Sequence, residues 1–243
     1  MAGHSKWHNI QRTKGAADAK RARLFTKIAR EMAVAVREGG GGDPDKNSRL
    51  AAVVAKAKAA NMSNDSINRT IEKALGAGVG DNYESVTYEG YGPCGVAVIV
   101  EAMTDNRNRI ASDMRLYFDK YGGKMGTAGC VSWSFDRKGV LIIDNLDGGL
   151  VEDDVLIDAL DAGADDVVTG DGVFEVYTAP DDFTAVNGAL EKAGYKFLSA
   201  QVEMIPQNYV KLTQPDDIRN MEKMLDLMEE NDDVQNVWHN YEP

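Results

Sequence analysis

The sequence has little cysteine and no long apolar run. Its two cysteines, Cys94 and Cys130, form no CxxC pair and no regular spacing, which indicates reduced thiols in a reducing compartment. The longest apolar run, Gly95 to Val100, is far shorter than the roughly 20 residues that cross a bilayer. No apolar stretch follows the basic residues of the N-terminus, as a secretory signal would require. We therefore expect a cytoplasmic protein that does not enter membranes.

Catalytic signatures are missing too. The chain has no P-loop, GxSxG, HExxH, Cys–His context or GxGxxG after a strand. His4 and His8 lie four residues apart without a third ligand nearby, so we expect no metal site and no cofactor. Five Asp-Asp pairs could hold Mg²⁺, which leaves a Mg²⁺-dependent hydrolase as a remote alternative. Three pairs begin predicted helices, where carboxylates stabilise the helix dipole, and two lie in turns. We predict a protein that is not an enzyme and has no small-molecule substrate.

Charge is distributed very unevenly along the chain. The net charge is −12, yet residues 1–80 hold 15 Lys and Arg against 7 Asp and Glu. Residues 81–243 hold 12 Lys and Arg against 32 Asp and Glu. Such asymmetry is typical of a polyanion-binding end attached to a solubilising remainder.

The basic end is predicted to be an arm followed by a helical domain. Residues 1–15 have no hydrophobic periodicity, whereas from Ala16 onward the apolar residues of one stripe recur at helical spacing: Phe25, Ile28, Ala29, Met32 and Val36. Gly39–Gly42 end this helix, and a second is expected at about 47–60. Ser63 is expected to cap a third helix that Gly76 closes, before a glycine-rich linker at 76–80.

The cations of this end are the candidate nucleic-acid site. Lys20, Arg23, Lys27 and Arg30 recur at helical spacing on the face opposite the apolar stripe, where each could neutralise a phosphate. In the arm, Trp7 offers a ring that could stack on an unpaired base. The full set of candidate cations here is Lys6, Arg12, Lys14, Lys20, Arg21, Arg23, Lys27 and Arg30. The alternative is that these cations bind no ligand and only form a solvated basic face that keeps the helix soluble.

A second candidate contact is the segment Thr104–Arg109, between a predicted strand and helix. Thr104 or Asp105 is expected to cap the helix. Arg107 and Arg109 offer two guanidinium groups that can each grip a phosphate through two hydrogen bonds.

Beyond residue 81 the pattern alternates between strands and helices, which predicts a multidomain α+β fold. Strands are expected at 86–89 and 96–102, a helix at 107–121, and a hairpin of 131–135 with 140–144. Helices at 152–162 and 181–193 then alternate with strands at 166–169, 173–177 and 196–202. The order ββαββαβ contains a ferredoxin-like βαββαβ unit. A helix at 215–230, whose Met221, Met224, Leu225 and Met228 are expected in the core, and a strand at 234–241 end the chain.

The predicted domains are therefore 1–80, the arm and helical domain; 81–130 with 204–243, a discontinuous α/β domain; and 131–203, an inserted ferredoxin-like domain.

Long motifs throughout the chain resemble the YebC family. They include AGHSKWHNI at 2–10, RARLFTKIAREM at 21–32, NMSNDSINRTIEKALG at 61–76, YEGYGPCGVAVIVEAMTDNRNR at 88–109 and DDVQNVWHNYE at 232–242. Cys94 and Ser63 stand where the family usually has Gly and Pro.

The resemblance implies three domains, with the middle one inserted, and a probable transcriptional regulator that binds DNA. A mitochondrial branch is similar to a translational activator, and bacterial relatives are linked to stalled ribosomes. DNA therefore stays open against ribosomal RNA as the target, and the oligomeric state stays open too. The sequence contains no recognition helix with polar base-reading residues, which slightly favours a translation factor.

Overall fold

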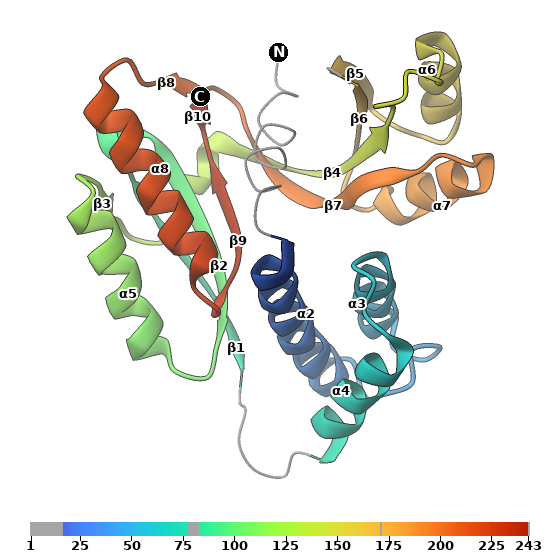
Figure 1. Cartoon of the computed structure of the whole chain (residues 1–243), viewed down its shortest axis with the longest axis horizontal. Coiled ribbons are helices and arrows are strands. Elements are labelled where there is room, and N and C mark those ends of the chain that lie inside the picture. Colours follow the sequence, from blue (N-terminus) through green and yellow to red (C-terminus); the bar gives the residue numbers. More distant parts are fainter. Residues whose placement is uncertain (1–16, 77–82, 171, 243) are drawn as a thin grey trace. The chain divides into compact units, whose positions relative to one another are not determined.

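The computed structural model of the chain describes residues 17–76, 83–170 and 172–242. They form two compact units (Figure 1). We call residues 132–210 with 240–242 the inserted unit, and residues 17–131 with 211–239, which flank it in the sequence, the outer unit. Helices and antiparallel sheets make up both, which confirms the predicted α+β class. The boundaries of the finer division into three domains stay a prediction.

The outer unit begins with three helices, α2 (Ala17–Glu38), α3 (Ser48–Ala59) and α4 (Asn64–Gly76), as predicted. Their core contains the apolar stripe of α2, including Ile28 and Met32, together with residues of the other two helices such as Leu50 and Ile67. Buried Asn47 fixes the turn between α2 and α3. Its side chain accepts a hydrogen bond from Leu50 N and donates to the carbonyl oxygens of Ala35 and Gly41.

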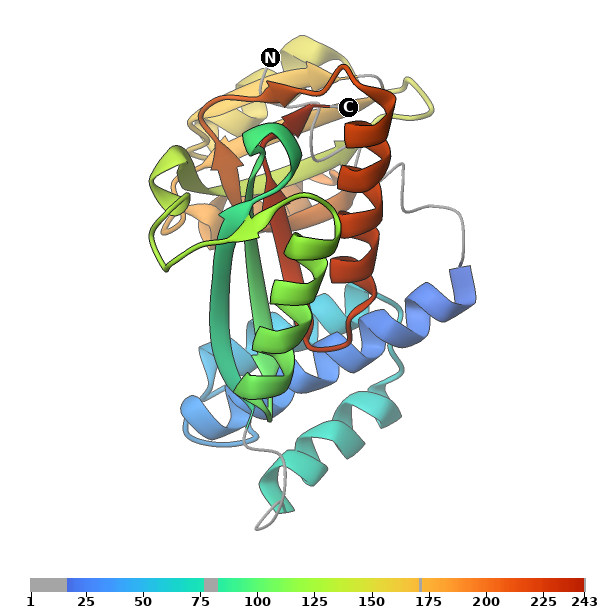
Figure 2. The same cartoon turned by 90° about the vertical axis from the view of Figure 1, so that its left-hand side faces the viewer.

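The sheet of the outer unit has four antiparallel strands in the order β3-β1-β2-β9. They are β1 (Glu84–Tyr91), β2 (Ala97–Thr104), β3 (Lys124–Met125) and β9 (Val234–His239), and the 3₁₀ turn η1 (Pro93–Gly95) separates the first two. Helices α5 (Arg107–Lys120) and α8 (Pro215–Glu230) lie side by side along this sheet (Figure 2). The predicted core methionines of α8 are fully buried.

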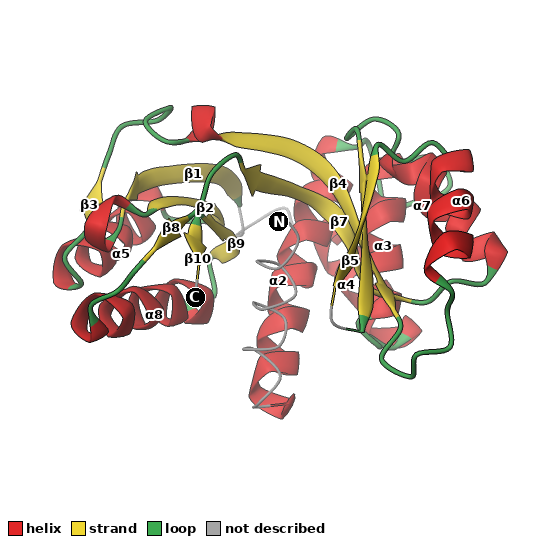
Figure 3. Ribbon diagram, turned by 90° about the horizontal axis from the view of Figure 1, so that it is seen from above, coloured by secondary structure: helices red, strands yellow, loops and turns green. Residues whose placement is uncertain are grey.

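The inserted unit has the ferredoxin-like order βαββαβ. Its elements are β4 (Phe135–Asp144), α6 (Glu152–Asp161), β5 (Asp166–Gly170), β6 (Val173–Thr178), α7 (Phe183–Ala193) and β7 (Phe197–Pro206). The antiparallel sheet has the order β5-β6-β4-β7, and both helices cover one of its faces (Figure 3). Alternate strand residues such as Leu141 and Val176 pack there against Val155 of α6 and Leu190 of α7.

The hairpin predicted around residues 136–139 is wrong. The 3₁₀ turn η2 (Ser132–Ser134) leads directly into β4, which runs through Asp136–Gly139 without a break. Because Asp136–Gly139 pairs with β7, and Gly139 also pairs with β6, ladder hydrogen bonds outweigh the turn preference of this polar segment. Gly139 marks a close approach instead of a turn, because a Cβ there would collide with Thr178 Oγ1.

The final predicted strand is divided into β9 and β10 (Tyr241–Glu242), and β10 pairs with the short β8 (Val210–Lys211). Cys94 and Cys130 form no disulfide. Among the helices of the described ranges, none combines the length and the apolar character that a membrane crossing requires.

Candidate nucleic-acid interface

The predicted cationic face of α2 lies opposite its core stripe, but its described cations already have partners. Arg23 Nη1 donates to Glu230 Oε1 at 3.2 Å, and Lys27 Nζ donates to the carbonyl oxygen of Glu229 at 3.2 Å. Arg30 forms an ion pair of 2.8 Å with Asp233 Oδ1 and donates to the carbonyl oxygen of Asp232. All these partners belong to residues 229–233, at the end of α8 and before β9, which we call the acidic turn.

Two further observations indicate that this face of α2 packs against the rest of the outer unit. Val34, one turn after Arg30, is only 1% exposed although it is not part of the three-helix core. The Arg30 guanidinium lies 5.4 Å from the centre of the Tyr83 ring, within cation–π range. The cations therefore sit at a packed junction, and the alternative of a wholly solvated basic face does not describe these three residues.

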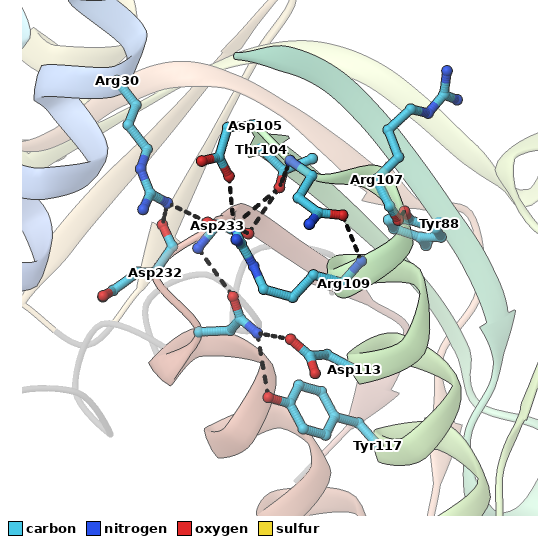
Figure 4. Close-up of polar contacts among 12 residues, drawn as sticks. Arg30, Tyr88, Thr104, Asp105, Arg107, Arg109, Asp113, Tyr117, Asp232 and Asp233 are labelled. Carbon is cyan, nitrogen blue, oxygen red and sulfur yellow. Dashed lines mark hydrogen bonds and ion pairs between the residues drawn. The ribbon is translucent and has the colours of Figure 1, made fainter. Parts of the chain in front are cut away.

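Asp233 is the centre of the junction (Figure 4). It is 4% exposed, and besides Arg30 it accepts hydrogen bonds from Arg109 Nη2 at 2.6 Å and Thr104 Oγ1 at 2.8 Å. Its backbone is held as well: its N–H donates to Asn231 Oδ1, and its carbonyl oxygen accepts from Met103 N. A buried carboxylate needs such complete pairing, because burial without partners strongly disfavours the charge.

The start of α5 positions Arg109. Asn106 is the N-cap, and its side chain accepts from Arg109 N at 3.1 Å, so the predicted cap by Thr104 or Asp105 is wrong. Thr104 Oγ1 instead accepts from Asn106 N at 3.0 Å. Asp105 accepts a second hydrogen bond from Arg109 Nη2, at 2.7 Å. Arg109 thereby spans Asp105 and Asp233.

The surroundings of these side chains shift the pKa values of Arg109, Asp105 and Lys27. Hydrogen bonds to Asp233 and Asp105 raise the pKa of Arg109, and the same guanidinium lowers the pKa of Asp105. Burial lowers the pKa of Lys27, although nearby Glu229 and Asp232 act in the opposite direction. The junction therefore holds cations that are partly withdrawn from water and compensated by acidic neighbours.

The remaining predicted site residues are not brought to this junction. Arg107 forms a 3.4 Å ion pair with Glu84, and its side chain is 64% exposed, so it offers a solvent-facing cation. Figure 4 shows its guanidinium pointing away from Asp233. The arm residues Lys6, Trp7, Arg12 and Lys14 lie outside the described residues, as do the side chains of Lys20 and Arg21.

Sequence reasoning missed the partners of the cations. It assigned the pair 232–233 to a turn, which is correct, but that assignment does not reveal the contact of Asp233 with Arg30 and Arg109. Three of the other Asp pairs lie where helices begin, as predicted, whereas Asp166 of the pair 165–166, expected in a turn, is the first residue of β5. Pairs 153–154 and 216–217 lie in the first turns of α6 and α8, and Asp182 is the N-cap of α7. Within residues 17–76, 83–170 and 172–242, no three His, Cys, Asp or Glu side chains could hold a metal ion together.

Comparison with known proteins decides the family. Residues 5–77 match the TACO1/YebC protein N-terminal domain, and residues 83–241 match the TACO1/YebC second and third domain. The chain belongs to the TACO1/YebC family. A relative from Acetivibrio thermocellus is 55% identical over 241 residues, which cover 99% of each chain. One from Lachnoclostridium phytofermentans is 52% identical over 242 residues and the full length of both. Both are named probable transcriptional regulatory proteins.

The fold is also that of a solved structure with a similar sequence. The crystal structure of a conserved hypothetical protein from Aquifex aeolicus is 41% identical in sequence and superposes with a TM-score of 0.84. The match covers 95% of this chain and 93% of the other. The resemblance stated from sequence motifs is thus confirmed along nearly the whole chain.

Proposed function

We propose that this chain is a cytoplasmic, non-enzymatic regulator of transcription that binds DNA through its basic N-terminal segment. The names of its relatives as regulatory proteins support the regulatory role. Within the structure, one observation carries the proposal. Arg23, Lys27 and Arg30 hold a row of oxygen atoms that belong to another segment of the chain. Cations spaced in this way along a helix fit the successive phosphate oxygens of a nucleic acid.

The helical segment around this row is cationic as well. Residues 17–76 carry 12 Lys and Arg against 7 Asp and Glu. Residues 132–210 carry 4 against 16, so the inserted unit repels a polyanion while the helical segment attracts it. This segregation of charge favours binding through the helical segment, because that segment attracts phosphates whereas the inserted unit repels them.

The test is a titration of the full chain against duplex DNA, single-stranded RNA and intact ribosomes at several salt concentrations. Changing Lys20, Arg23, Lys27 and Arg30 to Gln should weaken DNA binding and flatten its salt dependence, by about 0.9 in log–log slope per lost phosphate contact. The matched control changes four exposed cations of α3 and α4, Arg49, Lys58, Arg69 and Lys73, to Gln and removes the same charge.

Equal losses in the two variants would contradict an interface on α2 and indicate attraction by net charge alone. Tight ribosome binding, with DNA binding that moderate salt abolishes, would replace DNA by ribosomal RNA as the ligand. Hydrolysis of a phosphoester in the presence of Mg²⁺ would contradict the non-enzymatic assignment.

A further inference from the structure

We infer that the acidic turn, residues 229–233, occupies the phosphate-binding face of α2 as an internal competitor that nucleic acid must displace. The inference rests on the proposed function, because it assigns a regulatory state to the same cations. In this structure, Arg23, Lys27 and Arg30 all contact this one turn. The face is therefore closed to an external ligand until the turn moves away.

The geometry around Asp233 is that of a phosphate site filled by a carboxylate. Two guanidinium groups and one hydroxyl group converge on its two oxygen atoms, from Arg30, Arg109 and Thr104. A phosphodiester also presents two charged oxygen atoms to such a set of donors, and arginine binds either group through paired hydrogen bonds. Arg109 thus joins α2 in a site that neither segment forms alone.

The contacts become more exposed from one end of the turn to the other. The Asp233 side chain is 6% exposed and that of Arg30 is 15% exposed, whereas Arg23 and Glu230 are 39% and 54% exposed. An exposed ion pair contributes little to stability and is screened by salt, so an incoming polyanion can replace Glu230 first. Displacement then proceeds inward toward Arg30 and Asp233.

The competitor has the advantage of being part of the same chain. A tethered group acts at a high effective concentration, which a single free anion in dilute solution does not match. A polymer with several linked phosphates can replace several contacts together and overcome this advantage. The arrangement therefore selects a nucleic-acid backbone over inorganic phosphate.

The test compares the full chain with the double variant Asp232→Asn and Asp233→Asn, which keeps side-chain size but removes the competing charge. Fluorescence anisotropy with a labelled DNA duplex should show affinity higher by about tenfold, roughly the value of one charge-assisted hydrogen bond. The control variant, Asp153→Asn and Asp154→Asn, removes the same charge from α6 of the inserted unit and should change affinity less than about twofold.

A cycle of variants identifies the residues on which the turn acts. In a background with both Arg30→Gln and Arg109→Gln, the Asp232 and Asp233 changes should raise affinity no more than the control changes do, because both cations that Asp233 holds are absent. A full gain in that background would overturn the inference. So would equal affinity of the acidic-turn variant and the control variant.

Glu230→Gln provides a second test that leaves the buried Asp233 intact, should the double variant fail to fold by circular dichroism. It should raise affinity about twofold by releasing Arg23, in line with the small value of an exposed pair. An unchanged affinity would contradict the inference. Inorganic phosphate, added at the same phosphate concentration as the duplex, should not compete with the duplex; effective competition would contradict the polymer requirement.

The proposed function fails in a distinguishable way. If neither the wild-type chain nor any variant binds DNA, RNA or ribosomes at low salt, both the function and the inference are wrong. If the wild-type chain and the acidic-turn variant bind equally well, only the internal competitor is wrong.

Discussion

The two four-stranded sheets share one spatial layout but differ in the order in which the chain visits it. The inserted unit runs β4, α6, β5, β6, α7, β7 and forms the sheet β5-β6-β4-β7. In the outer unit, β2, α5 and β3 correspond to the first three elements, and α8 and β9 to the last two. The place of β6 is taken by β1, which precedes β2 in the chain.

This difference explains where the inserted unit begins and ends. In the inserted unit the chain passes from β5 through β6 to α7 without interruption. In the outer unit, β1 already fills the corresponding place in the sheet, so the chain between β3 and α8 need not cross it. Residues 132–210 lie in that interval. Strand order in the sheet therefore depends on which faces must be buried, whereas the connections can be rearranged.

The largest losses of stability should come from substitutions in the two separate cores. Phe118→Ala in α5 and Leu141→Ala in β4 each remove a side chain that is 0% exposed. Each should lower the free energy of unfolding of its own unit by about 3–4 kcal/mol. Differential scanning calorimetry should show that each variant shifts one transition and leaves the other in place. A common shift of all unfolding would mean that the units unfold as one cooperative body.

The next largest losses of stability are expected from substitutions at two glycines in central strands. A Cβ at Gly90 would lie 2.6 Å from the carbonyl oxygen of Lys124 in β3, whereas at Gly139 it would meet the side chains of Thr178 and Phe183. Gly90→Ala and Gly139→Ala should each destabilise by about 1–3 kcal/mol through overpacking. The loss should be larger for Gly90, because a paired backbone carbonyl cannot rotate away as a side chain can. Urea denaturation measures both, and the reverse ranking would contradict this reasoning.

The turn between β1 and β2 has a cysteine in the left-handed backbone region, whereas the turn between β5 and β6 has a glycine there. This difference predicts a substitution that should stabilise the protein. The turn between β5 and β6 has Gly172 at φ +75°, whereas η1, between β1 and β2, places Cys94 at φ 53°. A residue with a Cβ is strained there, so Cys94→Gly should raise stability by about 1 kcal/mol despite the lost contact with Asp217. Gly172→Ala should lower it by a similar amount. Equilibrium denaturation of both variants measures these changes in stability. A destabilised Cys94→Gly variant would show that the thiol contact outweighs the strain.

The elements were largely predictable because hydrophobic periodicity is a local signal. The stripe of α2 and the methionines of α8 identify their helices without any tertiary information. The segment 136–139 was not predictable in this way, because its strand conformation depends on a ladder with β7, which is distant in sequence. Local signals were equally insufficient at the start of α5, where three successive residues, Thr104, Asp105 and Asn106, can all cap a helix.

The candidate site was predictable only in part. Helical spacing places Arg23, Lys27 and Arg30 on one face, and the structure agrees with that placement. Their partners lie more than 200 residues away, and a single sequence does not show that the pair 232–233 folds back onto α2. Charge asymmetry therefore locates the cations but not the acidic residues that cover them.

The smallest effects should come from the hydrogen bonds that join the two helices of each layer. In the inserted unit, Tyr195 Oη donates to Asp158 of α6 at 2.7 Å; in the outer unit, Asn231 Nδ2 donates to Asp113 and Tyr117 of α5. Tyr195→Phe and Tyr117→Phe should each destabilise by about 0.5–1 kcal/mol at pH 7.

The Tyr195 contribution should depend on pH in the alkaline range. Burial and the bond to Asp158 raise the pKa of Tyr195 to about 12, above its ordinary value of 10.0, so the folded state retains the proton longer than the unfolded state. This contribution is therefore complete below pH 10 and is lost as the pH rises toward 12. The stability difference between wild type and Tyr195→Phe should shrink over that interval in denaturation curves. A difference that stays constant from pH 9 to pH 12 would show that Tyr195 ionises equally easily in both states, and that the hydrogen bond to Asp158 does not join the two helices in solution.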